Sequence, residues 1–369
     1  VMAADLATSP VTGLNVVLCG DAHLSNFGLF ASPERQLVFD MNDFDEAYPG
    51  PWEWDLKRLA ASAVVAGREN RFSDKVCRQL AVTVVEAYRE ATERFAQMHV
   101  LDVWYYHVNT DTVLELFEET ATKKGVERSR KLVEKARRKT HAQTLEKLTY
   151  IVDGRRRIIS DPPLLVPFRE LGLERFFSEE ELQKMSEEAV ESTWTQYLDS
   201  LPDERRFLLQ HFRIAGAALR VGGVGSVGTR CVIVLLEGEA SDDALILQLK
   251  EAGPSVLESY LPPRTYSQHA ERVVTGQRLM QATSDIFLGW HTSERSDRDY
   301  YWRQLKDMKG SADVAAMGEE GFKYYVGLCA VCLARAHART GDEARVWGYI
   351  GSNDAFAEAI GDFALAYAD

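Results

Sequence analysis

The sequence lacks the long apolar runs that membrane-spanning helices require. In a chain of 369 residues, the aliphatic stretches are short pieces such as "VIVLL" at 232–236. A transmembrane helix needs about 20 consecutive apolar residues, so no membrane association is expected. The N-terminal end shows no secretory leader pattern either. With 46% hydrophobic and 27% charged residues, the composition is that of a globular chain with a core of ordinary size.

Cysteine is scarce, and its spacing does not indicate disulfides. The chain has five cysteines, an odd number, scattered over its length, which is typical of a reducing compartment. Cys329 and Cys332 form a C-x-x-C, but they lie in the apolar segment "YYVGLCAVCLARAHAR" without a second cysteine pair. We therefore predict that both pack inside a helix rather than bind a metal, and that the protein is cytoplasmic.

An excess of positive charge is also missing. The formal net charge is −13, so general nucleic-acid binding is not expected. Residues 123–157 are the exception, with thirteen Lys or Arg against four Asp or Glu. Such a run is usually the solvated face of a helix, and the alternative is a surface that faces an anionic substrate or partner.

Hydrophobic periodicity divides the chain into a helical part, a β-rich part and a second helical part. Short apolar runs between turn residues predict strands and loops over 1–50. Apolar residues spaced three and four apart predict helices from 54 to about 103, and again from about 318 to the end. Between them, "TRCVIVLLEG" and "DALILQLKEA" are rich in strand formers.

A glycine pattern opens the β-rich part. Gly223, Gly225 and Gly228 form G-x-G-x-x-G, with Ser226 inside it. A strand follows this pattern, whereas a Rossmann motif opens a helix. The order strand, glycine loop, strand is the one with which protein kinases cover nucleotide phosphates. A glycine-rich β-turn without a ligand is the alternative.

A kinase-type glycine loop needs a lysine on the next strand and an acid on the helix after it. Lys250 ends the predicted strand "LILQLK", and Glu271 in "HAERVV" is the candidate acid, with Glu258 as the second choice. With these residues present, we predict that the loop and Lys250 bind the phosphates of ATP and that Glu271 orients the lysine.

Two short polar clusters lie near the N-terminal end, "GDAHLSN" at 20–26 and "NDFDEA" at 42–47. Asp and Asn that cap their own turns would explain either cluster alone. Phosphoryl transfer, however, needs a carboxylate near the acceptor hydroxyl and metal ligands near the phosphates. Hard oxygen ligands from Asp and Asn suit Mg²⁺.

These clusters resemble two patterns of the protein-kinase-like superfamily, especially of its aminoglycoside phosphotransferase branch: H-G-D-x-H-x-x-N and I-D-[FW]-x-[DE]-A. The resemblance implies that Asp21 is the catalytic base and that His23 shapes its loop. It also implies that Asn26, Asp43 and Asp45 bind magnesium. The sequence departs from the patterns where Cys19 and Asn42 replace their first His and their Ile.

The resemblance extends to Asp55 in "WEWDLKRLA", which matches the buried acid that braces the catalytic loop in this branch. The chain is similar over most of its length to an uncharacterised bacterial domain family that carries "GDAHLSNFG", "NDFDE", "GPWEWDLKRLA" and "VGSVGTR". In kinases the glycine loop comes before the catalytic loop, whereas here it comes about two hundred residues after it. The implied fold is α+β, a circularly permuted, kinase-like two-lobe fold. Its parts would be a helical catalytic lobe at 1–212, a β-rich nucleotide lobe at 213–307 and closing helices at 308–369.

From these observations we expect an ATP- and Mg²⁺-dependent phosphotransferase whose acceptor is a hydroxyl of a small molecule. A protein acceptor is not favoured, because "YPGPWEWD" follows the metal motif at once and leaves little room for a peptide platform. The alternatives are transfer of AMP by the same site and a nucleotide-binding module without activity. A metallophosphoesterase is less favoured. Its site needs several His ligands, usually including a G-N-H segment, and none of the eight His of the chain lies in one. No pattern specifies an oligomeric state.

Overall fold

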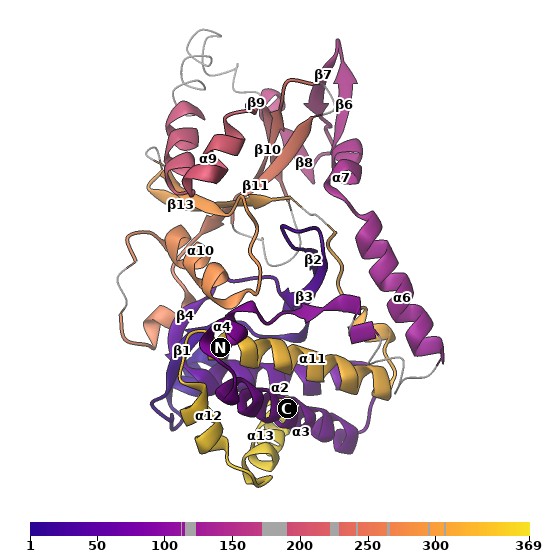
Figure 1. Cartoon of the computed structure of the whole chain (residues 1–369), viewed down its shortest axis with the longest axis vertical. Helices are drawn as coiled ribbons and strands as arrows, with labels where there is room; N and C mark the ends of the chain where they lie inside the picture. The colour runs from indigo at the N-terminus through magenta and orange to yellow at the C-terminus, as the bar shows by residue number, and fades with distance from the viewer. Residues whose placement is uncertain are drawn as a thin grey trace.

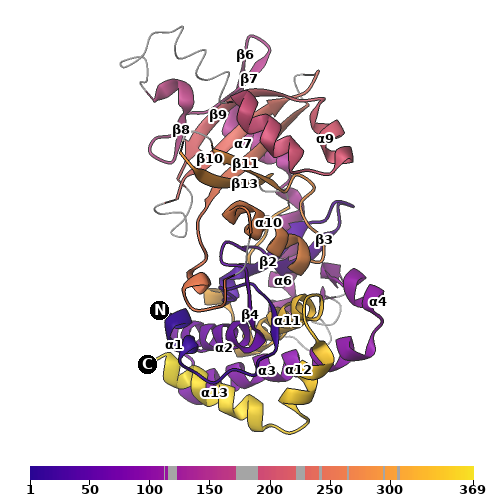
Figure 2. The same cartoon turned by 90° about the vertical axis from the view of Figure 1, so that its left-hand side faces the viewer.

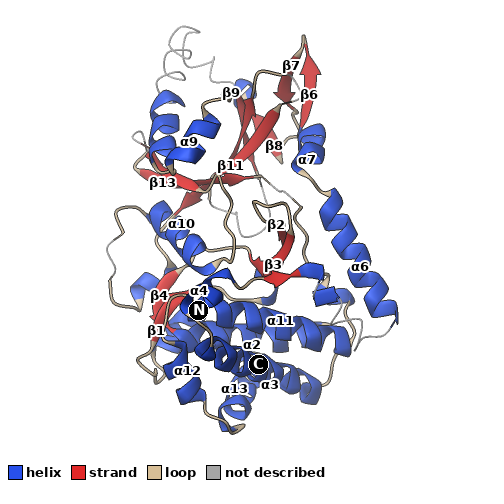
Figure 3. Ribbon diagram, in the orientation of Figure 1, coloured by secondary structure: helices blue, strands red, loops and turns tan. Residues whose placement is uncertain are grey.

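The computed structural model describes residues 1–111, 113–114, 123–171, 190–221, 229–240, 243–263, 266–293, 296–305 and 308–369. The protein is a mixed α and β structure in which helices gather at one end and most strands at the other (Figure 3). Both termini lie at the helical end (Figure 1). No described helix combines the length and the apolar character needed to cross a membrane.

A six-stranded antiparallel sheet forms the β-rich end (Figure 1). Successive residues of its central strand β10 enter two different clusters, Ile233 and Leu235 one, Val234 and Leu236 the other. This is the period of two that a strand imposes on its side chains, and it explains why "CVIVLLE" is apolar without interruption. The spatial order of the strands is β12 (Gly289–Ser293), β13 (Arg298–Gln304), β11 (Ala244–Ala252), β10 (Cys231–Glu237), β9 (Arg213–Arg220) and β8 (Leu165–Pro167).

The β-rich end begins earlier in the chain than the predicted boundary at 212/213. Strand β8 pairs with β9, and Leu145 and Ile158 belong to a core cluster of the sheet. Tyr197, in the helical residues 190–199, stacks on Trp302 of β13 at 4.3 Å between ring centroids. Sequence patterns predict elements but not the sheet or layer that each element joins, so these contacts were not predicted.

The helical end is built around α3 (Asp74–Gln97), which packs against α2 (Trp52–Glu69) and the three closing helices. Ser73 caps α3 by accepting a hydrogen bond from the Val76 amide. Cys329 and Cys332 are fully buried in α11, and burial raises the pKa of both thiols well above the usual value, which confirms helix packing. The closing helices are α11 (Glu319–Ala338), α12 (Glu343–Ile350) and α13 (Ala355–Tyr367).

Smaller elements complete the fold. The basic segment forms α6 along one side, and the β6–β7 hairpin extends from the β-rich end (Figures 1 and 2). Asp153 and Gly154 have positive φ angles of 50° and 73°, as the tight turn between two paired strands requires. These elements are α1 (Met2–Ala7), α4 (Val100–Tyr105), β5 (Val108–Asn109), α6 (Lys123–Arg138), α7 (His141–Leu148), β6 (Thr149–Val152), β7 (Arg155–Ile158) and α9 (Asp203–Leu209).

Four short strands place the two polar clusters side by side. Strand β1 (Asn15–Leu18) pairs with β4 (Tyr48–Pro51), and β2 (Phe27–Ala31) pairs with β3 (Leu37–Met41). The first cluster connects β1 to β2 and the second connects β3 to β4, so the pairing brings both connections to the same place. Helix α10 (His269–Met280) lies between these strands and the six-stranded sheet (Figure 1).

Candidate functional site

Asn26 ties the two polar loops together. Its Nδ2 donates to the backbone oxygens of Asp43 at 3.0 Å and Asp21 at 3.3 Å, and it lies 3.3 Å from Cys19 Sγ. The Asn42 amide in turn donates to the Asn26 carbonyl at 2.9 Å. Asn26 is buried, so these bonds fix both loops in one geometry.

Asp55 of α2 holds the start of the first polar loop, residues 20–26. This buried carboxylate accepts the backbone N–H groups of Cys19 at 2.6 Å and Gly20 at 3.0 Å. Gly20 has φ +81°, and a Cβ there would lie 2.2 Å from the carbonyl oxygen of Glu46, so no other residue type fits between the loops. The predicted bracing role of Asp55 is therefore seen directly.

A histidine that the sequence analysis missed supports the same carboxylate. His337 of α11 lies with Nε2 3.4 Å from Asp55 Oδ2, and its Nδ1 is 2.8 Å from the Tyr88 hydroxyl. Burial, and then the charge of Asp55, raise the pKa of Tyr88 well above its usual value. Donation from the phenol to Nδ1 and from the Nε2 N–H to Asp55 satisfies both contacts with a neutral ring. Cys19 occupies the position of the first His in the kinase-like pattern. Here the histidine next to Asp55 is His337, and it comes from helix α11.

Asp21, the candidate base, is half exposed and has two partners. Arg58 Nε donates to its Oδ1 at 2.8 Å, and His23 Nε2 lies 3.5 Å from Oδ2. His23 Nδ1 accepts the Ser25 amide at 3.2 Å and caps the short turn that leads to Asn26. Burial lowers the pKa of His23. A neutral His23 shapes the loop, as expected, and presents its Nε2 proton to Asp21.

Lys250 meets the second loop across 205 residues of sequence. Its ammonium forms a short ion pair with Asp45 Oδ2 and lies 3.6 Å from Asp43 Oδ1. The Tyr301 hydroxyl donates to the other oxygen of Asp45 at 2.6 Å. Burial, followed by the charge of Asp45, raises the pKa of Tyr301 well above its usual value, so the phenol remains a donor. Lys250 itself is buried.

The acid that pairs with Lys250 is therefore not the one expected. Glu271 sits in the first turn of α10 and accepts both the amide and the hydroxyl of Ser267, so it is held by the residues just before its own helix. Glu258 closes a capping box with Ser255 and lies 3.4 Å from Arg272. The predicted residues Gly223, Gly225, Ser226 and Gly228 lie outside the described part of the chain.

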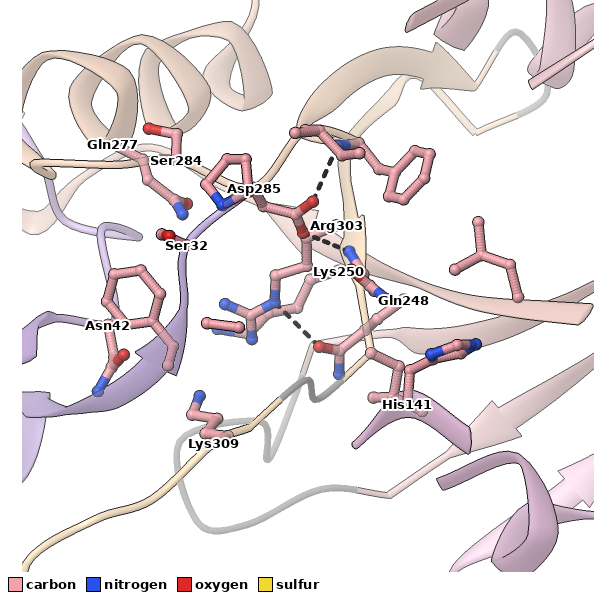
Figure 4. Close-up of a pocket in the computed structure, with 18 of the residues that line it drawn as sticks. Ser32, Asn42, His141, Gln248, Lys250, Gln277, Ser284, Asp285, Arg303 and Lys309 are labelled. Carbon is pink, nitrogen blue, oxygen red and sulfur yellow. Dashed lines mark hydrogen bonds between the residues drawn. The ribbon is translucent and has the colours of Figure 1, made fainter. Parts of the chain in front are cut away.

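A cavity of about 900 Å³ opens beside this ion pair. It lies between the six-stranded sheet and the loops of β2 and β3, within the size range of small-molecule sites. Figure 4 shows Arg303 near Lys250, with its Nε donating to Gln248 at 3.0 Å. Apolar side chains cover another part of its wall. The charged side chains that line it include Arg35, Asp43, Arg220, Lys250, Asp285 and Arg303.

The donor set beside the cavity fits a hard cation. The Nδ2 of Asn26 is bonded to both loops, and its Oδ1 is the oxygen that remains, although Asn26 is buried and is not among the residues that line the cavity. The Asp43 side chain is 51% exposed and faces the cavity. Both oxygens of Asp45, in contrast, are engaged by Lys250 and Tyr301, so Asp45 is placed as the partner of the lysine. Among the described residues no three His, Cys, Asp or Glu form a metal cluster, and Mg²⁺ held mainly by water and phosphates needs none.

Buried contacts that no motif indicated join α11 to β3 and α10 to the second loop. Arg335 donates to both oxygens of Asp40 at 2.8 Å, and both side chains are almost fully buried. Arg272 of α10 donates to the Ala47 carbonyl at 2.8 Å. In the sequence, each contact is indicated only by an arginine within an otherwise apolar helix. Such an arginine predicts a buried partner but not which residue it is.

With the geometry established, the chain can be compared with known proteins. The family described as "Uncharacterized protein conserved in bacteria (DUF2252)" matches residues 1–369. The chain belongs to this family. No curated protein and no solved structure matches the chain. The predicted membership of an uncharacterised bacterial family is thus confirmed, and the description carries no activity.

Proposed function

We propose that this member of the family is an ATP- and Mg²⁺-dependent phosphotransferase with a circularly permuted kinase-like arrangement. One observation carries the proposal: Lys250 of the sheet pairs with Asp45 and lies 3.6 Å from Asp43 at the wall of a 900 Å³ cavity. A lysine and a half-exposed carboxylate in one cavity are the groups that phosphate and metal binding require.

The order of the elements supports the same function. Residues 221–230 connect β9 to β10, which are antiparallel neighbours. Lys250 lies on β11, the next strand of the sheet, and α10 follows before β12 and β13. This is the order glycine segment, lysine strand, helix that the sequence analysis associated with kinases.

In this proposal each residue has one role. Asp21 accepts the proton of the acceptor hydroxyl, and Lys250 binds phosphate oxygens while Asp45 and Tyr301 orient it. Asn26 Oδ1 and the Asp43 carboxylate would hold Mg²⁺, which supplies positive charge to the phosphates when bound. A cytoplasmic location is part of the proposal, since all five cysteines are free thiols and buried.

Calorimetry of ATP binding with and without Mg²⁺ tests the nucleotide site. We expect Mg²⁺-dependent binding that weakens at least tenfold in Lys250→Ala and Asp43→Ala, because each removes an interaction with a charged group worth about 1.5–3 kcal/mol. Lys75→Ala and Asp102→Ala, both at exposed positions, are the matched controls and should bind as the wild type does. Equal binding by all five proteins, or no binding by the wild type, would refute the proposal. Asp21→Asn should bind ATP normally and lose transfer, and the product mass separates a phosphate adduct from an AMP adduct.

A further inference from the structure

A second cavity, of about 520 Å³, borders the candidate base. Asp21 and Glu46 line it, whereas Asp43 and Lys250 line the first cavity, and the two cavities share no lining residue. The amide of Asn26 bonds to the backbone oxygens of both Asp21 and Asp43. The loops that carry Asp21 and Asp43 are therefore bonded to each other, and the Asp21 carboxylate is on the side of the second cavity.

The wall of this second cavity is mainly apolar. Its acidic side chains are largely committed to the protein itself. Glu46 Oε2 accepts the Ser255 hydroxyl at 2.9 Å and the Val256 amide at 2.7 Å, Asp55 holds the first loop, and Asp21 pairs with Arg58. A polycationic ligand would need several carboxylates that are free of protein partners. This wall does not offer them, so such a ligand is not favoured. The apolar wall is formed by Met2, Leu6, Leu18, Trp54, Val256 and Leu257.

One polar group of the wall lacks a partner. Trp54 is only 4% exposed, and its buried Nε1 has no hydrogen-bond acceptor among the described residues. A buried donor without an acceptor is costly and unusual in folded proteins. Trp54 lines the cavity, but its Nε1 atom is closed off from solvent in this structure, so an oxygen atom of a bound molecule accepts this N–H only after a neighbouring side chain of the wall shifts.

We propose that the second cavity binds the acceptor, an uncharged alcohol with an apolar body and a second oxygen that accepts a hydrogen bond from Trp54. The role of the bound alcohol as acceptor rests on the proposed function, whereas binding of the alcohol does not. In the reaction the acceptor oxygen forms a bond to the γ-phosphorus of ATP and the bond from that phosphorus to the β,γ-bridging oxygen breaks. ADP leaves with the electron pair of that bond, and the hydroxyl proton passes to the Asp21 carboxylate.

Two probes of similar size test the assignment without nucleotide: naphthyloxyethanol, which has an ether oxygen, and naphthylpropanol, which has a CH₂ in its place. We expect wild-type protein to bind both in calorimetry. Trp54→Phe should weaken the ether about fivefold, the effect of one hydrogen bond, and leave the propanol unchanged. Val256→Trp, at a rim position 55% exposed, should abolish binding of both. Val65→Trp, at a position 54% exposed on α2, is the matched control.

The outcomes separate this assignment from the proposed function. If neither probe binds, or if Val256→Trp binds both normally, the acceptor assignment is overturned, regardless of whether the protein binds ATP. Equal loss of both probes in Trp54→Phe would overturn the role of the indole N–H. If the probes bind as expected but the protein does not bind ATP, the cavity stands as an alcohol site and the phosphotransferase proposal falls.

Discussion

The brace beneath the first polar loop gives the sharpest prediction. Asp55 is 2% exposed and accepts the amides of Cys19 and Gly20. Asp55→Ala leaves two buried N–H groups without an acceptor, each at a cost of about 1–3 kcal/mol, so we expect a loss of about 4 kcal/mol locally. Asp55→Asn keeps one acceptor oxygen and should cost roughly half as much.

Hydrogen exchange measured peptide by peptide is the assay, because the effect belongs to one loop. A local loss of about 4 kcal/mol raises the opening equilibrium of that loop by about 10³. The peptide that covers 15–28 should therefore exchange much faster in Asp55→Ala, whereas β10 at 231–237 should be unchanged. Asp102→Ala, at an exposed position, is the control. Unchanged exchange over 15–28 in Asp55→Ala would refute the idea that this carboxylate holds the loop.

Three further predictions concern the lysine, a buried histidine and a helix contact. Asp45→Asn should weaken ATP binding with and without Mg²⁺ by the same factor, and Glu271→Gln should not change it; a selective loss of the Mg²⁺ effect would make Asp45 a metal ligand instead. Burial lowers the pKa of His291 from 6.5 to about 4. The unfolded chain therefore takes up a proton that the folded one refuses, and stability should fall by up to about 3 kcal/mol from pH 6.5 to 4. Urea unfolding at several pH values measures this, and His291→Gln should flatten the curve. In Gly276→Ala the new Cβ would meet Ala47 Cβ at 2.6 Å, so stability should fall by about 1–3 kcal/mol, and a gain in urea midpoint would contradict the packing.

Local patterns predicted the elements well where periodicity was strong. The apolar spacing of "DLKRLAASAVVAG" predicted the helix now seen as α2. The same local logic placed Cys329 and Cys332 inside a helix. These features depend on residues only a few positions apart, so the local sequence pattern is enough to predict them.

The part of the sheet that precedes residue 212 depends on contacts of the opposite kind. Strand β8 has three residues, and it joins the sheet by pairing with β9 and by packing Leu165 into a core cluster of the sheet. The helical residues 190–199 reach the same layer through Tyr197, which stacks on Trp302 from a strand about a hundred residues later. Such contacts depend on tertiary pairing, which single-sequence patterns do not encode.

The partner of Lys250 shows how a resemblance can identify a residue and still misplace its contacts. Lys250 was recognised because a strand and a glycine pattern precede it, which are local features. Its partner depends instead on strand register: Lys250 is directly opposite Tyr301 of β13, so both can reach Asp45. Glu271 is meanwhile held at its own helix terminus by Ser267, where a carboxylate satisfies free backbone donors. The position of α10 is then fixed by packing of Gly276 and Arg272 on Ala47. The lysine and the helix are thus anchored separately, to the same polar loop, and that loop is the element on which the proposed nucleotide and acceptor sites both depend.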